Sequence, residues 1–130
     1  MSNLTNECLF CDIKKQNIIH STKFVYVVRD SYPVTKYHSL IIPHRHISDF
    51  FDLNRDELKD LSGILKKEKQ SLSNLDKEIT AFNVGVNAGV DAGQSIMHCH
   101  IHLIPRRKGD IENPRGGVRG VIPSKQKYVK

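Results

Sequence analysis

The sequence predicts an α+β fold: an antiparallel sheet of about five strands with one long helix packed on it. Several short stretches are rich in β-branched and aromatic residues, while a single longer stretch repeats leucine at helical spacing. Near the C-terminal end, histidines alternate with apolar residues, which is the period of a strand. At 130 residues, the chain is long enough for one domain with its own core.

The first half of the chain is predicted to hold a short helix and two strands. Residues 12–18 form the expected helix, and residues 23–29 the first strand, which ends at the turn Asp30-Ser31-Tyr32-Pro33. Residues 37–42 form the next strand, and Pro43 stops it because proline lacks the N–H that a sheet ladder needs. Two short strands in succession predict a meander.

A long helix is predicted from Arg55 to Lys77. Asn54 can cap its first turn while Glu57 reaches back to it in a capping box. The apolar residues of this stretch form one stripe that would pack on the sheet, namely Leu58, Leu61, Leu65, Leu72 and Leu75. A coiled coil is the alternative, but one stripe over roughly three heptads fits core packing better.

A further strand over residues 79–87 is followed by a glycine-rich loop over 87–95, which leads into the last strand over 97–105. Gly89 and Gly93 can adopt positive φ and let backbone N–H groups approach an anion closely. Such a loop is a weak indication by itself. It predicts a phosphate-binding loop here because alternating histidines follow at once.

His98, His100 and His102 would share one face of the last strand, while the residues between them face the core. A metal site is one interpretation, since neighbouring histidines on a strand can bind one ion. At about 3.3 Å of rise per residue, however, the outer two lie about 13 Å apart along the strand. One ion cannot bind both, so the three histidines should have divided roles.

Cys8 and Cys11 form a Cys-x-x-Cys motif, which can hold zinc in a tight turn if two further ligands join it. A redox pair is the alternative, but that motif usually follows a strand and opens a helix. Cys99 should be a small core residue. The odd count of 3 cysteines argues against a secreted disulfide framework. With no long apolar run and no apolar N-terminal segment, we expect a cytoplasmic enzyme without a membrane span.

The last strand resembles the signature of the histidine triad (HIT) superfamily, His-x-His-x-His with apolar residues at the x positions. The match extends upstream through Gly93-Gln94-Ser95 and downstream through Pro105-Arg106-Arg107. Earlier in the chain, Asp30, then His38, then Ile41-Ile42-Pro43 with His46 three residues on, resemble the first half of such proteins. The resemblance implies a HIT domain over residues 1–110, with a zinc knuckle at 8–11, acting on a purine nucleotide as a hydrolase or nucleotidyl transferase.

The resemblance also implies roles for single residues. His100 would be the nucleophile that attacks the α-phosphorus, with His102 as its catalytic partner. The expected nucleotide- and phosphate-binding residues are Asp30, His38, Asn87, Gln94, Ser95 and His102, with Asp30 on the ribose hydroxyls. The expected ligands of a structural zinc ion are Cys8, Cys11, His46 and His98. Family members commonly form homodimers through the helix and an edge strand.

The substrate stays open at this point. Asp30, Asn87 and Ser95 resemble the purine-nucleotide phosphoramidase branch, whereas Gly93-Gln94 and the segment from Pro105 to Asp110 resemble the fragile-histidine-triad branch, which cleaves dinucleoside polyphosphates. A nucleotidyl transferase or phosphorylase is the alternative enzyme. His102 favours a hydrolase, because the uridylyltransferase branch has glutamine there. A nucleotide-binding regulatory module is the non-enzymatic alternative.

Residues 111–130 are predicted to form a basic C-terminal tail. The formal net charge of the chain is +6, and residues 106–130 hold 8 basic and 2 acidic side chains. Such a segment can contact phosphates of a substrate or of a nucleic acid. It can equally be a solvated terminus, as charge runs usually are.

Overall fold

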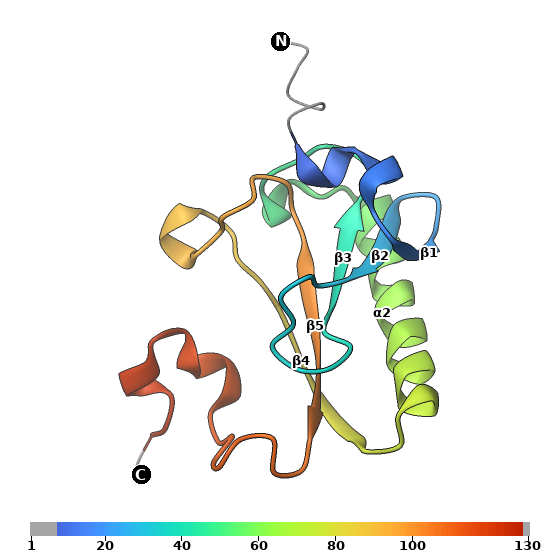
Figure 1. The fold of residues 1–130 in the computed structure, drawn as a ribbon. Coiled ribbons are helices and arrows are strands. Elements are labelled where there is room, and N and C mark those ends of the chain that lie inside the picture. The colour runs from blue at the N-terminus through green and yellow to red at the C-terminus, as the bar shows by residue number, and fades with distance from the viewer. Residues whose placement is uncertain (1–7, 129–130) are drawn as a thin grey trace.

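The computed structural model describes residues 8–128 and has the predicted α+β architecture (Figure 1). One five-stranded sheet has the order β1-β2-β3-β5-β4, and every neighbouring pair is antiparallel. One long helix, α2 (Arg55–Leu75), packs on it. The strands are β1 (Ile18–Ser21), β2 (Val25–Arg29), β3 (Ser39–Pro43), β4 (Ile79–Val86) and β5 (Ile101–Arg107).

Helix α2 begins with the predicted capping box: Glu57 N–H donates to the Asn54 side chain, and Asn54 N–H donates to the Glu57 carboxylate. These two bonds satisfy amide groups that a helix start would otherwise leave unpaired. The buried stripe differs in part from the predicted one. Leu61, Ile64 and Leu72 are buried, whereas Leu58 and Leu75 are exposed. The helix ends at Leu75 rather than at the predicted Lys77, and Leu75 is not part of the core.

The sheet has two apolar faces with different partners. Val25, Val27, Ile41, Ile101 and Leu103 pack with α2 in the larger core. The alternate residues Tyr26, Val28, Leu40 and Ile42 point to the other face, where Phe10 joins them in a smaller core. Because side chains alternate along a strand, both faces of β2 and β3 are buried, and the strands are nearly continuous apolar runs.

Other predicted elements also differ in their bounds, and β3 includes Pro43, which was predicted to stop it. Residues 12–18 hold only the 3-10 turn Ile13–Lys15, and a short strand, β1, follows that was not predicted. The last strand starts at Ile101 instead of residue 97 and runs to Arg107. The carbonyl of His98 accepts a hydrogen bond from the His100 ring, and Cys99 N–H donates to the carbonyl of Ile47. These two groups therefore cannot join the ladder of the neighbouring strands.

The segment after β5 folds back on the sheet rather than leaving it. It contains two 3-10 helices, η5 (Gly117–Val121) and η6 (Pro123–Lys125), and lies apart from α2 in Figure 1. The Arg119 guanidinium donates to the carbonyls of Lys125 and Gln126, which closes the segment on itself. Within residues 8–128, no helix has the length and apolar character that crossing a membrane requires.

Candidate active site and metal site

The three histidines lie on the sheet face that α2 does not cover. Only His102 belongs to β5 itself, where it pairs with Leu40 of β3 and Gly85 of β4. His98 and His100 are buried, and His102 is half-buried. The rings of His100 and His102 are neighbours, with centroids 5.3 Å apart. The structure therefore separates the histidines into two environments, one around His98 and one around His102, with His100 between them.

His98 faces the N-terminal cysteines. Its Nε2–H donates to the carbonyl of Pro43 at 2.8 Å, so the proton is on Nε2 and the Nδ1 lone pair is free. That Nδ1 lies 3.3 Å from Cys8 Sγ and 3.4 Å from Cys11 Sγ. His46 completes the group, with its Nδ1 at 3.0 Å from Cys11 Sγ and 3.2 Å from His98 Nδ1. Metal-binding histidines usually donate their other ring N–H to a carbonyl or carboxylate in this way, which fixes the orientation of the ring.

These four side chains fit a zinc ion. Their ligand atoms all lie within 4.8 Å of one another. Zinc–sulfur bonds of about 2.3 Å and zinc–nitrogen bonds of about 2.0 Å place tetrahedral ligands about 3.3 to 3.8 Å apart, close to the spacing seen here. Burial, with a smaller effect from Cys8, raises the pKa of Cys11 to about 11. A bound cation would reverse that shift by stabilising the thiolates.

His100 has the opposite arrangement of its ring nitrogens. Its Nδ1–H donates to the carbonyl of His98 at 2.8 Å, which leaves the lone pair on Nε2. Phe10 packs against the ring in a T-shaped contact, with centroids 5.2 Å apart. His100 is thus held in one orientation by a hydrogen bond on one side and an aromatic contact on another. Its free lone pair is what nucleophilic attack requires.

His38 fixes the tautomer of His102. Val34 N–H donates to His38 Nδ1 at 3.0 Å, so the His38 proton is on Nε2, which donates to His102 Nδ1 at 2.9 Å. The proton of His102 is therefore on Nε2. An Asp30 carboxylate oxygen lies 3.5 Å from His38 Nε2 and completes the chain. His102 consequently presents an N–H donor beside the lone pair of His100.

Burial favours the neutral form of both rings in this pair. It lowers the pKa of His38, against a smaller opposing effect of Asp30. It also lowers the pKa of His102, with a further contribution from the neighbouring His100 and His38 rings. The hydrogen-bond chain from Val34 to His102 requires neutral imidazoles. The lowered pKa values keep it intact at neutral pH.

The predicted phosphate-binding residues are not all available for binding. Gln94 is buried, its Oε1 accepts from Gly89 N–H, and its Nε2 donates to the carbonyls of Ser48 and Ile96. In this structure its side chain holds the glycine loop in shape. Ser95 is exposed on that loop, and Asn87 is half-buried beside His102 in the wall of a cavity. Asp30 keeps one carboxylate oxygen on Tyr32 N–H.

Two features were not predicted as parts of the site. Phe10 contacts both His98 and His100, although in the sequence it appears only as one of the two residues between the cysteines. An aromatic residue inside a Cys-x-x-Cys motif was the available signal. The second feature is the pairing of the arginines that follow the triad. Arg106 binds Asp110 and Arg107 binds Asp76, so neither is a free phosphate ligand.

Comparisons with known proteins identify the family of this chain. The HIT domain family model matches residues 12–109. An asymmetrical bis(5'-nucleosyl)-tetraphosphatase of Schizosaccharomyces pombe is 36% identical over 94 residues, which are 72% of this chain and 51% of that protein. An AP-4-A phosphorylase of Mycobacterium tuberculosis is 34% identical over 94 residues, 72% of this chain and 48% of that protein. The chain thus spans about half the length of these two relatives.

A solved structure gives the same result for the fold. The crystal structure of a zinc-bound histidine triad family protein from Mycobacterium smegmatis superposes with a TM-score of 0.76 at 25% identity, covering 84% of this chain and 81% of that one. The family model covers most of the chain and spans the candidate metal ligands His46 and His98 and all three triad histidines. The chain therefore belongs to the HIT domain family.

Proposed function

We propose that the protein is a nucleotide hydrolase that cleaves adenosine nucleotides at the α-phosphate through a nucleotidyl-histidine intermediate on His100. One observation carries the proposal: neighbouring hydrogen bonds give His100 and His102 complementary nitrogens. His100 has its lone pair on Nε2, because Nδ1–H is used on the His98 carbonyl. His102 has its proton on Nε2, because Nδ1 accepts from His38. A nucleophile and a hydrogen-bond donor thus lie side by side.

The bond changes follow from that pairing. The His100 Nε2 lone pair forms a bond to the α-phosphorus, and the bond from phosphorus to the departing oxygen or nitrogen breaks with its electron pair. The departing group takes up a proton at that step or from solvent. Water then attacks the phosphorus, the bond to Nε2 breaks, and the nucleoside monophosphate leaves. His102 Nε2–H and the exposed Ser95 hydroxyl would donate to the phosphate oxygens as their charge grows.

The proposed substrates are dinucleoside polyphosphates and adenosine phosphoramidates. The first class is supported by relatives whose names describe hydrolysis or phosphorolysis of dinucleotides. The second rests on Asp30, Asn87 and Ser95, which resemble the phosphoramidase branch. Because one relative is named a phosphorylase, transfer of the nucleotidyl group to inorganic phosphate is the second candidate activity. It needs the same intermediate and differs only in the acceptor.

We also propose a structural zinc ion and a homodimer. Cys8, Cys11, His46 and His98 would hold the ion, whose charge would stabilise the two thiolates and tie the N-terminal segment to the triad. Four protein ligands leave no open position for substrate. The dimer would form at the edge strand β4, where Val84 is 47% exposed. Analytical ultracentrifugation tests the dimer, and elemental analysis tests the metal.

The central test is to trap the intermediate. Wild-type protein, His100→Asn and a control, His20→Asn, are mixed with diadenosine tetraphosphate, quenched at short times and weighed intact by mass spectrometry. Wild type and the β1 variant should gain a nucleotidyl group and turn over, whereas His100→Asn should bind nucleotide without either. Turnover by His100→Asn at the wild-type rate would refute the mechanism. Added phosphate that becomes part of the product would favour the phosphorylase.

A further inference from the structure

A cavity of about 550 Å³ lies beside His102 on the face that α2 does not cover. Its floor is formed by β4 and β5, and its wall by the segment that follows β5. His102 and Asn87 line it, whereas His100 is not among its lining residues. The cavity is therefore continuous with the candidate active site on the side of His102. The proposed bond changes at the α-phosphorus assign no part of the substrate to this cavity.

Gly85 has no side chain to fill the cavity at its floor. In the sheet register Gly85 stands directly opposite His102, and their side chains would share one face. A β-carbon built at Gly85 meets no atom within 4 Å, so a side chain there would project into open space. The missing side chain leaves room next to the imidazole. A larger residue at this position is expected to fill the cavity without disturbing the backbone.

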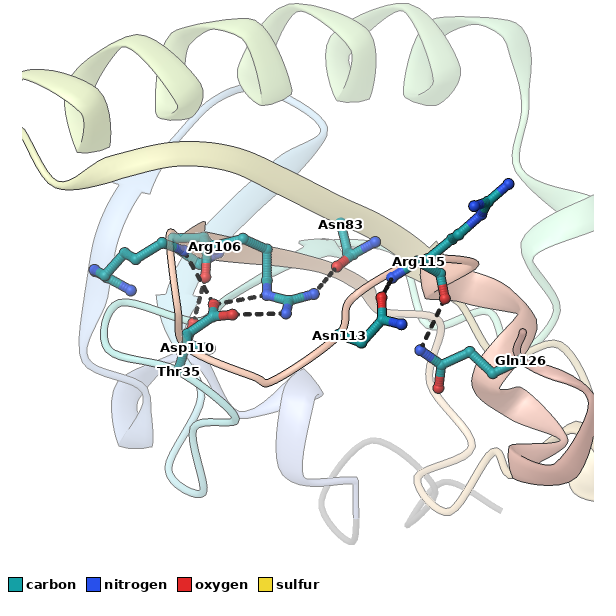
Figure 2. A network of polar contacts seen from close by, with 9 residues as sticks. Thr35, Asn83, Arg106, Asp110, Asn113, Arg115 and Gln126 are labelled. Atoms are coloured by element: carbon teal, nitrogen blue, oxygen red, sulfur yellow. Dashed lines mark hydrogen bonds and ion pairs between the residues drawn. The ribbon is translucent and has the colours of Figure 1, made fainter. Parts of the chain in front are cut away.

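The wall is a built structure rather than a loose terminus. Gly116 has φ 88°, and a β-carbon there would lie within van der Waals overlap of the Gln126 carbonyl. The Gln126 amide donates to the carbonyl of Arg115, and Arg115 N–H donates to the Asn113 side chain, as Figure 2 shows. A β-carbon built at Gly117 would lie 3.3 Å from the side-chain nitrogen of Asn83, so the segment lies close against β4. Residues 113–126, which we call the cap, are thus closed on themselves and seated on the sheet.

Arg106 and Asp110, two charged side chains that line this cavity, form an ion pair with each other. The Arg106 guanidinium donates twice to the Asp110 carboxylate, at 2.8 Å each, and once to the Asn83 side-chain oxygen at 2.7 Å (Figure 2). This two-point bond holds Arg106 against its carboxylate and uses the donors that a phosphate would need. The remaining lining combines amides, glycine backbone and aliphatic side chains such as Val118 and Val121. Such a surface suits an uncharged aromatic or apolar group better than a chain of phosphates.

We propose that this cavity binds the departing part of the substrate and selects groups with an uncharged aromatic body. The inference rests on the proposed function, because it assumes attack by His100. In a displacement at phosphorus, the departing group leaves on the side away from the nucleophile. Phe10 packs against His100, whereas the cavity lies beside His102 and is not lined by His100. An aromatic body could be the second nucleoside of a dinucleoside polyphosphate or an aromatic amine of a phosphoramidate.

The test fills the cavity and compares departing groups. Gly85→Leu is assayed on diadenosine tetraphosphate, on an adenosine phosphoramidate of an aromatic amine, and on the unsubstituted phosphoramidate, whose departing group is ammonia. Gly63→Leu is the matched control, since Gly63 is an exposed glycine of α2 that also has no atom within 4 Å of a built β-carbon. We expect kcat/KM to fall by about 10-fold or more on a substrate with an aromatic departing group and by less than about 2-fold on the unsubstituted one.

Each outcome has one meaning. A selective loss on the dinucleotide identifies the aromatic body as a nucleoside, and a selective loss on the aryl phosphoramidate identifies it as an amine. Equal losses on all three substrates would overturn the inference, because the cavity would then hold the part that they share. Unchanged rates on all three would overturn it too. Val121→Asp, which adds a carboxylate to the cap, should repeat the selective loss if Gly85→Leu folds poorly. Wild-type protein that hydrolyses none of the substrates would instead refute the proposed function.

Discussion

Phe10 stands between Cys8 and Cys11 in the sequence and packs against His100 in a T-shaped contact, with ring centroids 5.2 Å apart and an angle of 61° between the planes. The same ring meets His98 at 6.0 Å, and the Phe10 carbonyl accepts a hydrogen bond from the buried Tyr26 hydroxyl. The segment that carries two candidate metal ligands therefore also supports the candidate nucleophile. The proposed metal binding and the orientation of His100 would share one structural element.

Replacing Phe10 should lower the rate of turnover more than it weakens substrate binding. Phe10→Ala removes the contact that limits the His100 ring, and a displacement of about 1 Å can cost about 100-fold in rate. We expect kcat to fall by about 10-fold or more, with a smaller loss for Phe10→Leu. Leu9→Ala, at an exposed neighbouring position, is the control. A wild-type kcat for Phe10→Ala, in protein with its full metal content, would show that the contact is only structural.

Removing a metal ligand should cost stability. Purified protein is expected to contain about one zinc per chain, and Cys8→Ala should reduce that content and lower the free energy of unfolding by about 2 kcal/mol or more. Cys99→Ala is the control, because that thiol lies in the core beside α2 and not among the candidate ligands. Elemental analysis and chemical denaturation measure the two effects. Zinc retained at full content in Cys8→Ala would contradict the ligand assignment.

Stability should fall as the pH drops below about 6.5, the ordinary pKa of histidine. Because burial lowers the pKa values of His38 and His102, the unfolded chain binds more protons than the folded one in this range. The stability is fully present above the unfolded pKa and is lost as pH falls through the folded values, by up to about 1.4 kcal/mol per pH unit for each group.

The contribution of His38 can be separated from that of the other histidines. His38→Gln cannot take up a proton, so its free energy of unfolding should decline less steeply between about pH 6.5 and pH 5 than that of wild type. His20→Gln in β1 is the control for replacing a histidine by glutamine. Urea denaturation at a series of pH values gives both curves. Parallel curves for wild type and His38→Gln would mean that His38 is not held neutral by folding.

Freeing Arg106 should change how the protein responds to phosphate charge. Asp110→Asn removes the carboxylate that neutralises Arg106 inside the cavity, so KM for diadenosine tetraphosphate should fall by about 2- to 5-fold at low salt and return as salt rises. Asp76→Asn is the matched control, since it frees Arg107, which does not line the cavity. An equal effect of both variants would indicate general attraction by a more basic surface.

The sequence predicted those parts of the fold that rest on local signals. The capping box of Asn54 and Glu57 is a pattern of neighbouring residues, and it starts α2 as predicted. The rise of a strand predicted divided roles for His98 and His102. His98 lies outside β5, but its ring and that of His102 do lie in different clusters. The four cysteine and histidine side chains grouped by the family resemblance lie within 4.8 Å of one another at their ligand atoms.

The remaining features depend on contacts between distant residues. β5 begins at Ile101 because Cys99 N–H donates to Ile47, a partner that no spacing in the sequence reveals. The buried position of Gln94 results from its bonds to Ser48 and Gly89. Charge counting suggested free cations after the triad, but the pairing of Arg106 with Asp110 appears only when the chain is folded.

The ligand atoms around His98 come from three separate stretches of the chain, and Cys8 and His98 are 90 residues apart in sequence. During synthesis, the two cysteines emerge before His46 and His98, and the last of these ligands follows β4 in the chain. A zinc ion that ties these stretches together closes a very long loop, which costs little more entropy than a moderate one. If zinc binds there as we propose, metal loading follows the synthesis of His98. Chains without the proposed zinc ion would lack this tie between the segment that carries Phe10 and the triad.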